Sequence, residues 1–354
     1  MLALTITSVS SAQSPEPTEV PAYLFKGAVP IERAPPDYPM NALFHEKEGW
    51  VNVNFIIDKT GKPTDIVITD SAGAKSFRRA AISAVEGWRF EPATLNGEPV
   101  LQCRNDHRVS FRLNPPSTAA SPNFVARYRR ASRVLEKGDI ERARKFVREL
   151  REYGTNNFYE TGAYWNLRLR LAAKEQDFSM MRHAAGRVVA HDQGQVPADS
   201  TRQAAIIRYK LLVQDNFFGE AKNLRARFAD LGVDDDDPSL APYHARLAAA
   251  EEEIPAYGTK GRINHEVWSI VLVKPSFYLE DVSGDIRDIE IRCAHHRESA
   301  AQGQASDESV ARRLLFEDKA WLVPERWGGE CHVMVYGDPG TEFTMVQQSV
   351  ANTR

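Results

Sequence analysis

Cysteine and histidine side chains near the C-terminal end of the chain have the spacing most suited to chemistry. Cys293 precedes His295 and His296, and Cys331 precedes His332. Thiolate and imidazole groups are good zinc ligands, so the two groups together could hold an ion. Neighbouring residues of a strand point to opposite faces, however, which makes convergence on one ion difficult. In an exported chain a disulfide between Cys293 and Cys331 is the economical arrangement, and free thiols are the third possibility.

Sequence signatures of the common enzyme classes are missing. There is no Gly-x-Ser-x-Gly nucleophile elbow, phosphate-binding loop, dinucleotide fingerprint or His-Glu-x-x-His helix. His45 and His107 are isolated, and a surface or partner-contact position is expected for each. We therefore expect no enzyme activity, no cofactor and no bound metal. The alternative is a metal-dependent envelope enzyme in the C-terminal part, which would hold its metal through Cys293 and Cys331.

A second kind of chemistry, main-chain hydrogen bonding, is available along a polar strand at residues 104–110. Its members are Arg104, Asn105, Asp106, His107, Arg108, Val109 and Ser110. A strand at the edge of a sheet leaves one row of N–H and C=O groups unpaired, and an extended peptide can pair with that row as an added strand. The charged side chains would discourage self-pairing while permitting a chosen partner. The alternative is an edge that the linker or another domain already covers.

A small mixed α/β unit is expected to position this strand. Residues 51–57 alternate in the period-2 pattern of a strand with one covered face. A turn and residues 64–70 predict an antiparallel return strand, and apolar residues recur at helical spacing over 77–88. We expect the helix to cover one face of the sheet and the last strand to lie at its edge.

Short motifs in this unit occur in a specific order. They are Tyr38-Pro39, Gly49-Trp50-Val51, Phe55-Ile56-Ile57-Asp58, Gly61, Asp70-Ser71, Ala80-Ala81, Ala84-Val85 and Trp88-Arg89-Phe90-Glu91-Pro92-Ala93. In order and spacing they resemble the C-terminal domain family of the TonB energy transducers, over about residues 35–113. The resemblance implies a periplasmic domain of a Gram-negative cell that binds the TonB-box peptide of an outer-membrane transporter. It also implies that Tyr38 and Pro39 belong to the Tyr-Pro motif of the family, and that residues 104–110 pair with the peptide.

The resemblance leaves two functional alternatives open. Transducers of this family carry an N-terminal membrane helix and a long proline-rich spacer, and the sequence shows neither. An unanchored adaptor is therefore favoured over an energised transducer whose membrane anchor lies upstream of Met1. In a different class, the helical region would serve as a scaffold or adaptor for envelope protein assembly. Neither the oligomeric state nor the specific partner follows from the sequence.

The first residues of the chain favour export. Residues 1–13 are apolar and hydroxyl-rich with small residues around Ala12, as at the end of a secretory signal, although a basic start is missing. We interpret them as a truncated signal segment, followed by an extended, mobile Pro/Glu linker over residues 14–29. A disordered cytosolic tail is the alternative. No other segment is apolar over the roughly 20 residues that a bilayer requires, and the expected location is the periplasm.

Changes in composition and proline-rich segments divide the rest of the chain into domains. It has 354 residues and a net charge of −3, so two or three domains are expected and a nucleic-acid partner is not. Prolines and small polar residues over 114–122 separate the first domain, 30–114, from a helical domain at 123–253. Strand-like segments return afterwards and predict a β-sandwich over 257–350 that one disulfide closes.

A weak repeat runs through the helical domain. Ile140, Phe178 and Phe218 occupy similar places, 38 and 40 residues apart, compared with about 34 residues in tetratricopeptide repeats. We expect a tetratricopeptide-like array of helical hairpins, with an irregular bundle as the alternative. The expected fold class is α+β multidomain, with a small α+β domain, a helical hairpin array and a β-sandwich-like domain.

Overall fold

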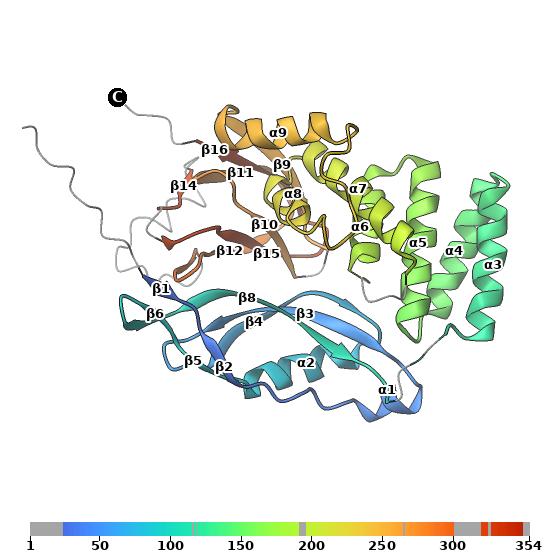
Figure 1. The fold of residues 1–354 in the computed structure, drawn as a ribbon, viewed down its shortest axis with the longest axis horizontal. Helices are drawn as coiled ribbons and strands as arrows, with labels where there is room; N and C mark the ends of the chain where they lie inside the picture. Colours follow the sequence, from blue (N-terminus) through green and yellow to red (C-terminus); the bar gives the residue numbers. More distant parts are fainter. Residues whose placement is uncertain are drawn as a thin grey trace, which may run out of the picture.

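A computed structural model shows the chain as three packed units (Figure 1). It describes residues 24–114, 117, 119–190, 196–264, 266–300, 320–324 and 327–349. We call the described residues up to 114 the N-terminal unit, those from 119 to 253 the helical unit, and those from 256 onward the C-terminal unit. The expected signal segment and the first part of the linker, residues 1–23, lie outside the described residues. No helix in these ranges combines the length and the apolar character that crossing a membrane requires.

The N-terminal unit is built on an antiparallel sheet with a long helix beneath it (Figure 1). Its elements are β1 (Phe25–Lys26), β2 (Val29–Glu32), α1 (Met40–Phe44), β3 (Gly49–Ile57), β4 (Pro63–Ala72), α2 (Ser76–Gly87), β5 (Arg89–Glu91), β6 (Ala93–Leu95), β7 (Glu98–Val100) and β8 (Gln102–Phe111). The main sheet has the order β4-β3-β8, beside two smaller sheets, β1-β6-β7 and β2-β5. The end of the expected linker therefore takes part in this unit, because β1 pairs with β6 and β2 with β5.

Both faces of strand β3 are buried, whereas the sequence pattern predicted one covered face. On the predicted face, Val51 and its alternating neighbours pack against Phe77 of α2. On the opposite face, Trp50, Asn54 and Ile56 are at most 2% exposed. The other two units cover this second face. The buried side chain of Asn54 is hydrogen-bonded there to Asp106 and Arg292, and a hydropathy pattern does not predict such bonds.

The helical unit is an array of helical hairpins, as expected. Its helices are α3 (Pro122–Glu136), α4 (Ile140–Tyr153), α5 (Phe158–Glu175), α6 (Phe178–Val189), α7 (Ala198–Gln214), α8 (Phe218–Arg225) and α9 (Ala241–Glu252). The pairs α3/α4, α5/α6 and α7/α8 are joined in sequence and packed side by side (Figure 1). Ile140, Phe178 and Phe218 each begin the second helix of a pair.

A left-handed residue recurs at the turn inside each helical hairpin. Gly138, Gln176 and Asn216 have φ values of 79°, 55° and 64°, and each lies two residues before the second helix of its hairpin. A left-handed residue ends the first helix and reverses the chain within a few residues. Asp139 and Asp177 then cap the following helices through their carboxylate oxygens. Glycine, glutamine and asparagine share this backbone conformation without sharing a side-chain type, so the repeat is weak in the sequence.

The C-terminal unit contains two four-stranded antiparallel sheets. Its strands are β9 (Ala256–Arg262), β10 (Val267–Val271), β11 (Ser276–Ser283), β12 (Ile286–Arg292), β13 (Arg297–Ser299), β14 (Trp321–Leu322), β15 (His332–Gly337) and β16 (Glu342–Gln348). The sheets have the orders β10-β15-β12-β13 and β14-β11-β16-β9. Side chains of both sheets, such as Val333 and Phe277, share one buried cluster, which also includes Phe218 of the helical unit. The expected β-sandwich-like unit is therefore present, and it shares a core with the helices.

A buried ion network joins the N-terminal sheet to the C-terminal unit. Arg292 is 1% exposed and binds both carboxylate oxygens of Glu290, at 2.9 and 3.0 Å. Its Nη1 donates to the side-chain oxygen of Asn54 on β3 at 2.6 Å. Arg297 also binds Glu290 and pairs with Asp65 of β4 at 3.3 Å. Burial would raise the pKa of Glu290, but the two arginines hold it below its usual value, so the carboxylate is ionised.

The helical unit meets the same sheet face through Trp50. The guanidinium of Arg108 lies 4.4 Å and that of Arg187 5.3 Å from the centre of the indole ring. Arg187 extends from α6 and pairs with Asp70 of β4 at 3.0 Å. Cation–π contacts of this kind gain strength when solvent is excluded, as it is around the fully buried Trp50.

We expect Arg292→Met to destabilise the protein by about 3 kcal/mol, because it removes the hydrogen bond to the buried side-chain oxygen of Asn54 and two of those to the Glu290 carboxylate. Urea unfolding followed by tryptophan fluorescence measures the effect. The control is Arg262→Met on β9, whose ion pair with Glu342 is exposed and is expected to contribute less than about 1 kcal/mol. Equal effects of the two substitutions would contradict the role given to the buried network.

Candidate functional site

Strand β8 lies at one edge of the main sheet, with β3 as its neighbour in the order β4-β3-β8. The pairing is antiparallel and runs from Gly49 opposite Phe111 to Ile57 opposite Gln102, with an irregularity near Phe55. The polar segment predicted to bind a partner, residues 104–110, falls entirely within this strand. The edge position that peptide pairing requires is therefore present.

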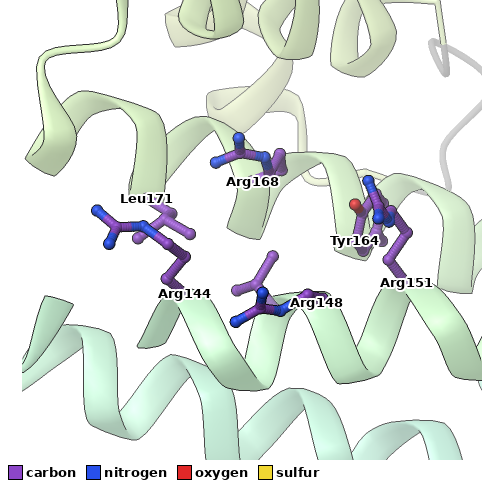
Figure 2. Close-up of a pocket in the computed structure, with 7 residues that line it drawn as sticks. Arg144, Arg148, Arg151, Tyr164, Arg168 and Leu171 are labelled. Carbon is purple, nitrogen blue, oxygen red and sulfur yellow. The ribbon is translucent and has the colours of Figure 1, made fainter. Parts of the chain in front are cut away.

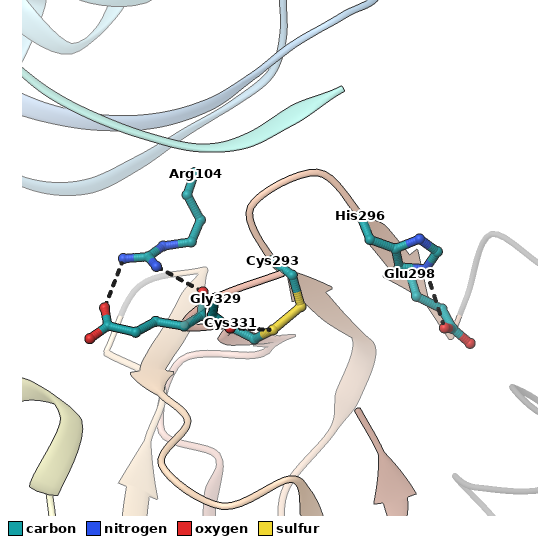
Figure 3. Close-up of a disulfide and its surroundings, with 7 residues drawn as sticks. Arg104, Cys293, His296, Glu298, Gly329 and Cys331 are labelled. Carbon is teal, nitrogen blue, oxygen red and sulfur yellow. Dashed lines mark hydrogen bonds and ion pairs between the residues drawn. A yellow bond between two sulfur atoms is a disulfide. The ribbon is translucent and has the colours of Figure 1, made fainter. Parts of the chain in front are cut away.

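The beginning of β8 is covered by the C-terminal unit. The N–H of Cys103 donates to the carbonyl oxygen of Ala294 at 3.1 Å. Arg104 donates to the carbonyl oxygen of Glu330 at 2.8 Å and pairs with its carboxylate at 3.3 Å. The covering residues are neighbours of Cys293 and Cys331, which form the expected disulfide (Figure 3). The alternative of an edge covered by another domain thus holds for this part of β8.

Polar side chains along the middle of β8 point to the face that the other units cover. Asp106 accepts a hydrogen bond from Asn54 at 2.9 Å, and Arg108 donates to Asn52 at 2.9 Å. Arg108 also donates to the carbonyl oxygen of Ala190, at the end of α6, at 2.5 Å. These contacts hold the strand in register with β3 and tie it to the helical unit. The Asn105 side chain donates to the backbone of the same sheet.

The alternate residues of β8 face α2. The His107 ring lies edge-on to Trp88, with 4.9 Å between ring centres, and Val109 is buried in the core. Burial, together with the charge of Arg33, lowers the pKa of His107, so the ring is neutral at neutral pH. This environment suits a packed ring better than a catalytic base.

The end of β8 is more open and lies beside α1 (Figure 1). Ser110 is exposed, and three apolar side chains of α1 are exposed as well: Met40 at 76%, Leu43 at 43% and Phe44 at 83%. A short helix that presents three large apolar side chains to solvent is typical of a partner-binding surface. None of these three residues was predicted as part of a site, although the apolar pair Leu43-Phe44 stands outside any predicted strand or long helix in the sequence.

Tyr38 and Pro39 connect this surface to the core. The Tyr38 ring packs edge-on against Phe77 and Phe111, at 5.6 and 5.9 Å between ring centres, and its hydroxyl donates to the carbonyl oxygen of Lys47. Burial, with a smaller contribution from Glu48, raises the pKa of Tyr38 to about 12. Pro39 is the residue before α1. The pair therefore anchors α1 next to the end of β8.

A family model described as Gram-negative bacterial TonB protein C-terminal matches residues 34–113. Residues 34–113 form a TonB C-terminal domain. The matched range includes α1, the main sheet with its edge strand β8, and α2. The expectation drawn from the short motifs of the sequence is thereby confirmed for this part of the chain.

Curated relatives are similar to the chain over part of its length. Protein TonB of Pseudomonas aeruginosa is 34% identical over 102 residues, which are 27% of this chain and 30% of that protein. Protein TonB of Vibrio cholerae is 27% identical over 106 residues, 30% of this chain and 41% of the relative. A solution NMR structure of the Pseudomonas aeruginosa TonB C-terminal domain covers 24% of this chain and 86% of its own, at 29% identity and a TM-score of 0.22. The chain thus spans well under half the length of these curated relatives.

The histidines proposed as zinc ligands are dispersed around the disulfide. His296 stacks on Trp327 at 3.9 Å between ring centres, and His295 lies 5.7 Å from the ring centre of Phe25. Cys293 and Cys331 are consumed by their bond to each other. In the described ranges, no three His, Cys, Asp or Glu side chains are grouped as metal ligands. Burial raises the pKa of the remaining thiol, Cys103, to about 12, which makes it a poor nucleophile.

A basic groove between α4 and α5 is the place where a scaffold function of the helical unit would hold an acidic partner. Its volume is about 170 Å³, and Arg144, Arg148, Arg151 and Arg168 line it, with Tyr164 beside Arg151 at one end (Figure 2). Glu175 already pairs with Arg144 at 2.7 Å and with Arg168 at 3.3 Å. Two of the four arginines are therefore already paired within the unit, and the groove is a weaker candidate than the edge of the TonB C-terminal domain.

Reduction of the Cys293–Cys331 disulfide is expected to speed amide hydrogen exchange at Cys103 by about tenfold or more. The disulfide joins the two segments that cover the beginning of β8, and without it these segments open more often. Exchange followed by mass spectrometry or NMR measures the change, with Val53 in the central strand as the internal control. An unchanged exchange rate at Cys103 would show that the contacts of Arg104 with Glu330 keep the beginning of β8 covered without the disulfide.

Proposed function

We propose that this protein binds an extended segment of an outer-membrane transporter, or of another envelope protein, by strand addition at β8 of its TonB C-terminal domain. The observation that carries the proposal is the edge position of β8 inside a matched TonB C-terminal domain. Main-chain hydrogen bonds to the edge supply affinity in this binding mode, and pockets for alternate side chains supply specificity. The site of action is the periplasm of a Gram-negative cell, and no catalytic step is involved.

The segment enters from the end of β8 and pairs with residues 106–111. The beginning of the strand is closed by the contacts of Cys103 and Arg104, so a partner has to use the later part. Beyond that part, the exposed side chains of α1 offer an apolar surface to the side chains of the bound segment. Binding of a transporter segment through both its main chain and its side chains would provide the contact that energy-coupled transport requires.

Backbone recognition can be separated from side-chain recognition with two N-methylated peptides. A TonB-box peptide of about ten residues is methylated at three alternate amides, and a second peptide carries the methyl groups at the intervening amides. Only alternate residues of a strand bond to a given edge, so one peptide should lose about 30-fold or more in affinity for the full chain and the other should keep it. Titration calorimetry measures both. Equal affinities of the two methylated peptides would refute strand addition.

The contribution of α1 can be tested with two exposed phenylalanines. Phe44→Ser is expected to weaken binding of the unmodified peptide by roughly 5- to 30-fold, because part of an apolar contact is lost. Phe178→Ser at the start of α6 is the matched control, since its side chain is also exposed, at 57%. Neither ring lies in the core, so neither substitution should prevent folding. If both variants bind the peptide equally well, the segment does not reach α1.

A further inference from the structure

A cavity with both polar and apolar wall residues lies where the three units meet. Its volume is about 340 Å³. The TonB C-terminal domain contributes Asp106 to its wall, the helical unit Arg208 and Glu220, and the C-terminal unit Ser269 and His332. This volume falls within the range of small-molecule sites and is larger than one or two water molecules need.

Several polar groups that line the cavity lack a hydrogen-bond partner. Glu220 accepts a hydrogen bond from the N–H of Val271 at 3.1 Å through Oε1, whereas its Oε2 is shielded from solvent and unpartnered. The Nε2 of His332 is shielded and unpartnered in the same way. Unsatisfied groups of this kind cost free energy, so a site that collects two of them is suited to a molecule that can satisfy both.

The partly buried Arg208 supplies a positive charge to the same cavity. Its guanidinium lies over Gly186 of α6, where an added Cβ would come within 2.1 Å of Nη1. Asp70 and Glu220 attract it electrostatically, but in the described chain neither is hydrogen-bonded to it. Asp70 is held by Arg187, and the neighbouring Arg182 is paired with Asp215 at 3.0 Å. The guanidinium of Arg208 can therefore donate hydrogen bonds to a ligand, and Arg227 adds a second positive charge to the wall of the cavity.

The charges around the cavity favour an anionic group at its inner end. Burial raises the pKa of Glu220 to about 7, against the effect of Arg208 and Arg182, so its carboxyl group is partly protonated near neutral pH and can donate a hydrogen bond. Burial and the charge of Arg104 lower the pKa of His332, which leaves its ring neutral. At the outer end, the carboxylate of the exposed Asp106 can accept a hydrogen bond from a ligand.

We propose that this cavity binds a small carboxylate that also carries a hydroxyl or ammonium group. The carboxylate lies against Arg208 and Glu220, and the donor group faces Asp106. A molecule bound there contacts all three units, so it stabilises their packing and links a small-molecule signal to the domain that carries β8. The site uses the side chain of Asp106 on the covered face of β8, whereas a peptide would pair with the main chain of its edge, so occupancy of the cavity does not depend on peptide binding.

Thermal unfolding and titration calorimetry of the full chain test the proposal. Malate and succinate differ by one hydroxyl group, and inorganic phosphate tests for an anion alone. Malate is expected to raise the midpoint of unfolding and to bind at least about tenfold more tightly than succinate, because only malate offers a donor to Asp106. Equal binding of malate, succinate and phosphate would show a general anion site and would overturn the proposed ligand class. Absence of binding at millimolar concentrations would show a cavity that holds water only.

Two substitutions test whether the ligand binds in this cavity. Arg208→Gln removes the cation and is expected to abolish binding of malate. Asn223→Asp adds a negative charge to an exposed wall residue, where folding is not at risk, and is expected to weaken binding at least about tenfold. The matched control is Asn123→Asp at the exposed start of α3, which should leave binding unchanged. Equal affinity for malate in wild type and Asn223→Asp would place the ligand elsewhere and refute the assignment.

Discussion

The buried guanidinium of Arg292 is the interaction on which the arrangement of the units depends. Removing such a charge from water costs several kcal/mol, and only a full set of partners offsets that cost. Glu290 supplies two of them within the C-terminal unit, and Asn54 and the carbonyl oxygen of Asp65 in the TonB C-terminal domain supply the others. Because two of these partners belong to a different unit, separating the units would break their hydrogen bonds and leave part of the guanidinium unpaired or exposed to water. Arg292 is thereby the most buried of the contacts that hold the TonB C-terminal domain on the C-terminal unit, beside the pairs that Arg297 forms with Asp65 and Arg104 with Glu330.

That packing decides which part of the edge strand is available. With its second face buried, the main sheet offers a partner its edge rather than a face. The C-terminal unit also closes the first residues of β8 through Ala294 and Glu330, while the last residues remain beside the exposed apolar side chains of α1. The binding proposed here is therefore directional, and the units added to the TonB C-terminal domain restrict its edge as well as support it.

The parts of the fold that rest on local spacing could be predicted from the sequence. The alternation along β3, the apolar stripe of α2 and the helical hairpins all follow from periods of 2 and 3.6 residues. The second face of β3 could not be predicted in this way. Asn54 has the polarity of a solvent-facing residue, but it is 2% exposed, because its partner Arg292 lies 238 residues away in the sequence. A hydropathy pattern cannot distinguish a polar residue in water from one in a buried network.

The features of the candidate site likewise fall into those that the sequence predicts and those that only the tertiary structure shows. The order and spacing of short motifs were sufficient for the resemblance to the TonB C-terminal domain family. Strand periodicity was sufficient for the polar strand, and the cysteine arrangement in an exported chain for the disulfide, because these are local or compositional properties. Tertiary structure decided the rest: that Cys103 and Arg104 are covered, that α1 exposes Phe44, and that Arg208 and Glu220 reach one cavity with His332. Each of these depends on contacts between residues far apart in the chain, where burial and electrostatic pairing are set by the packing of whole units and not by the spacing of neighbours.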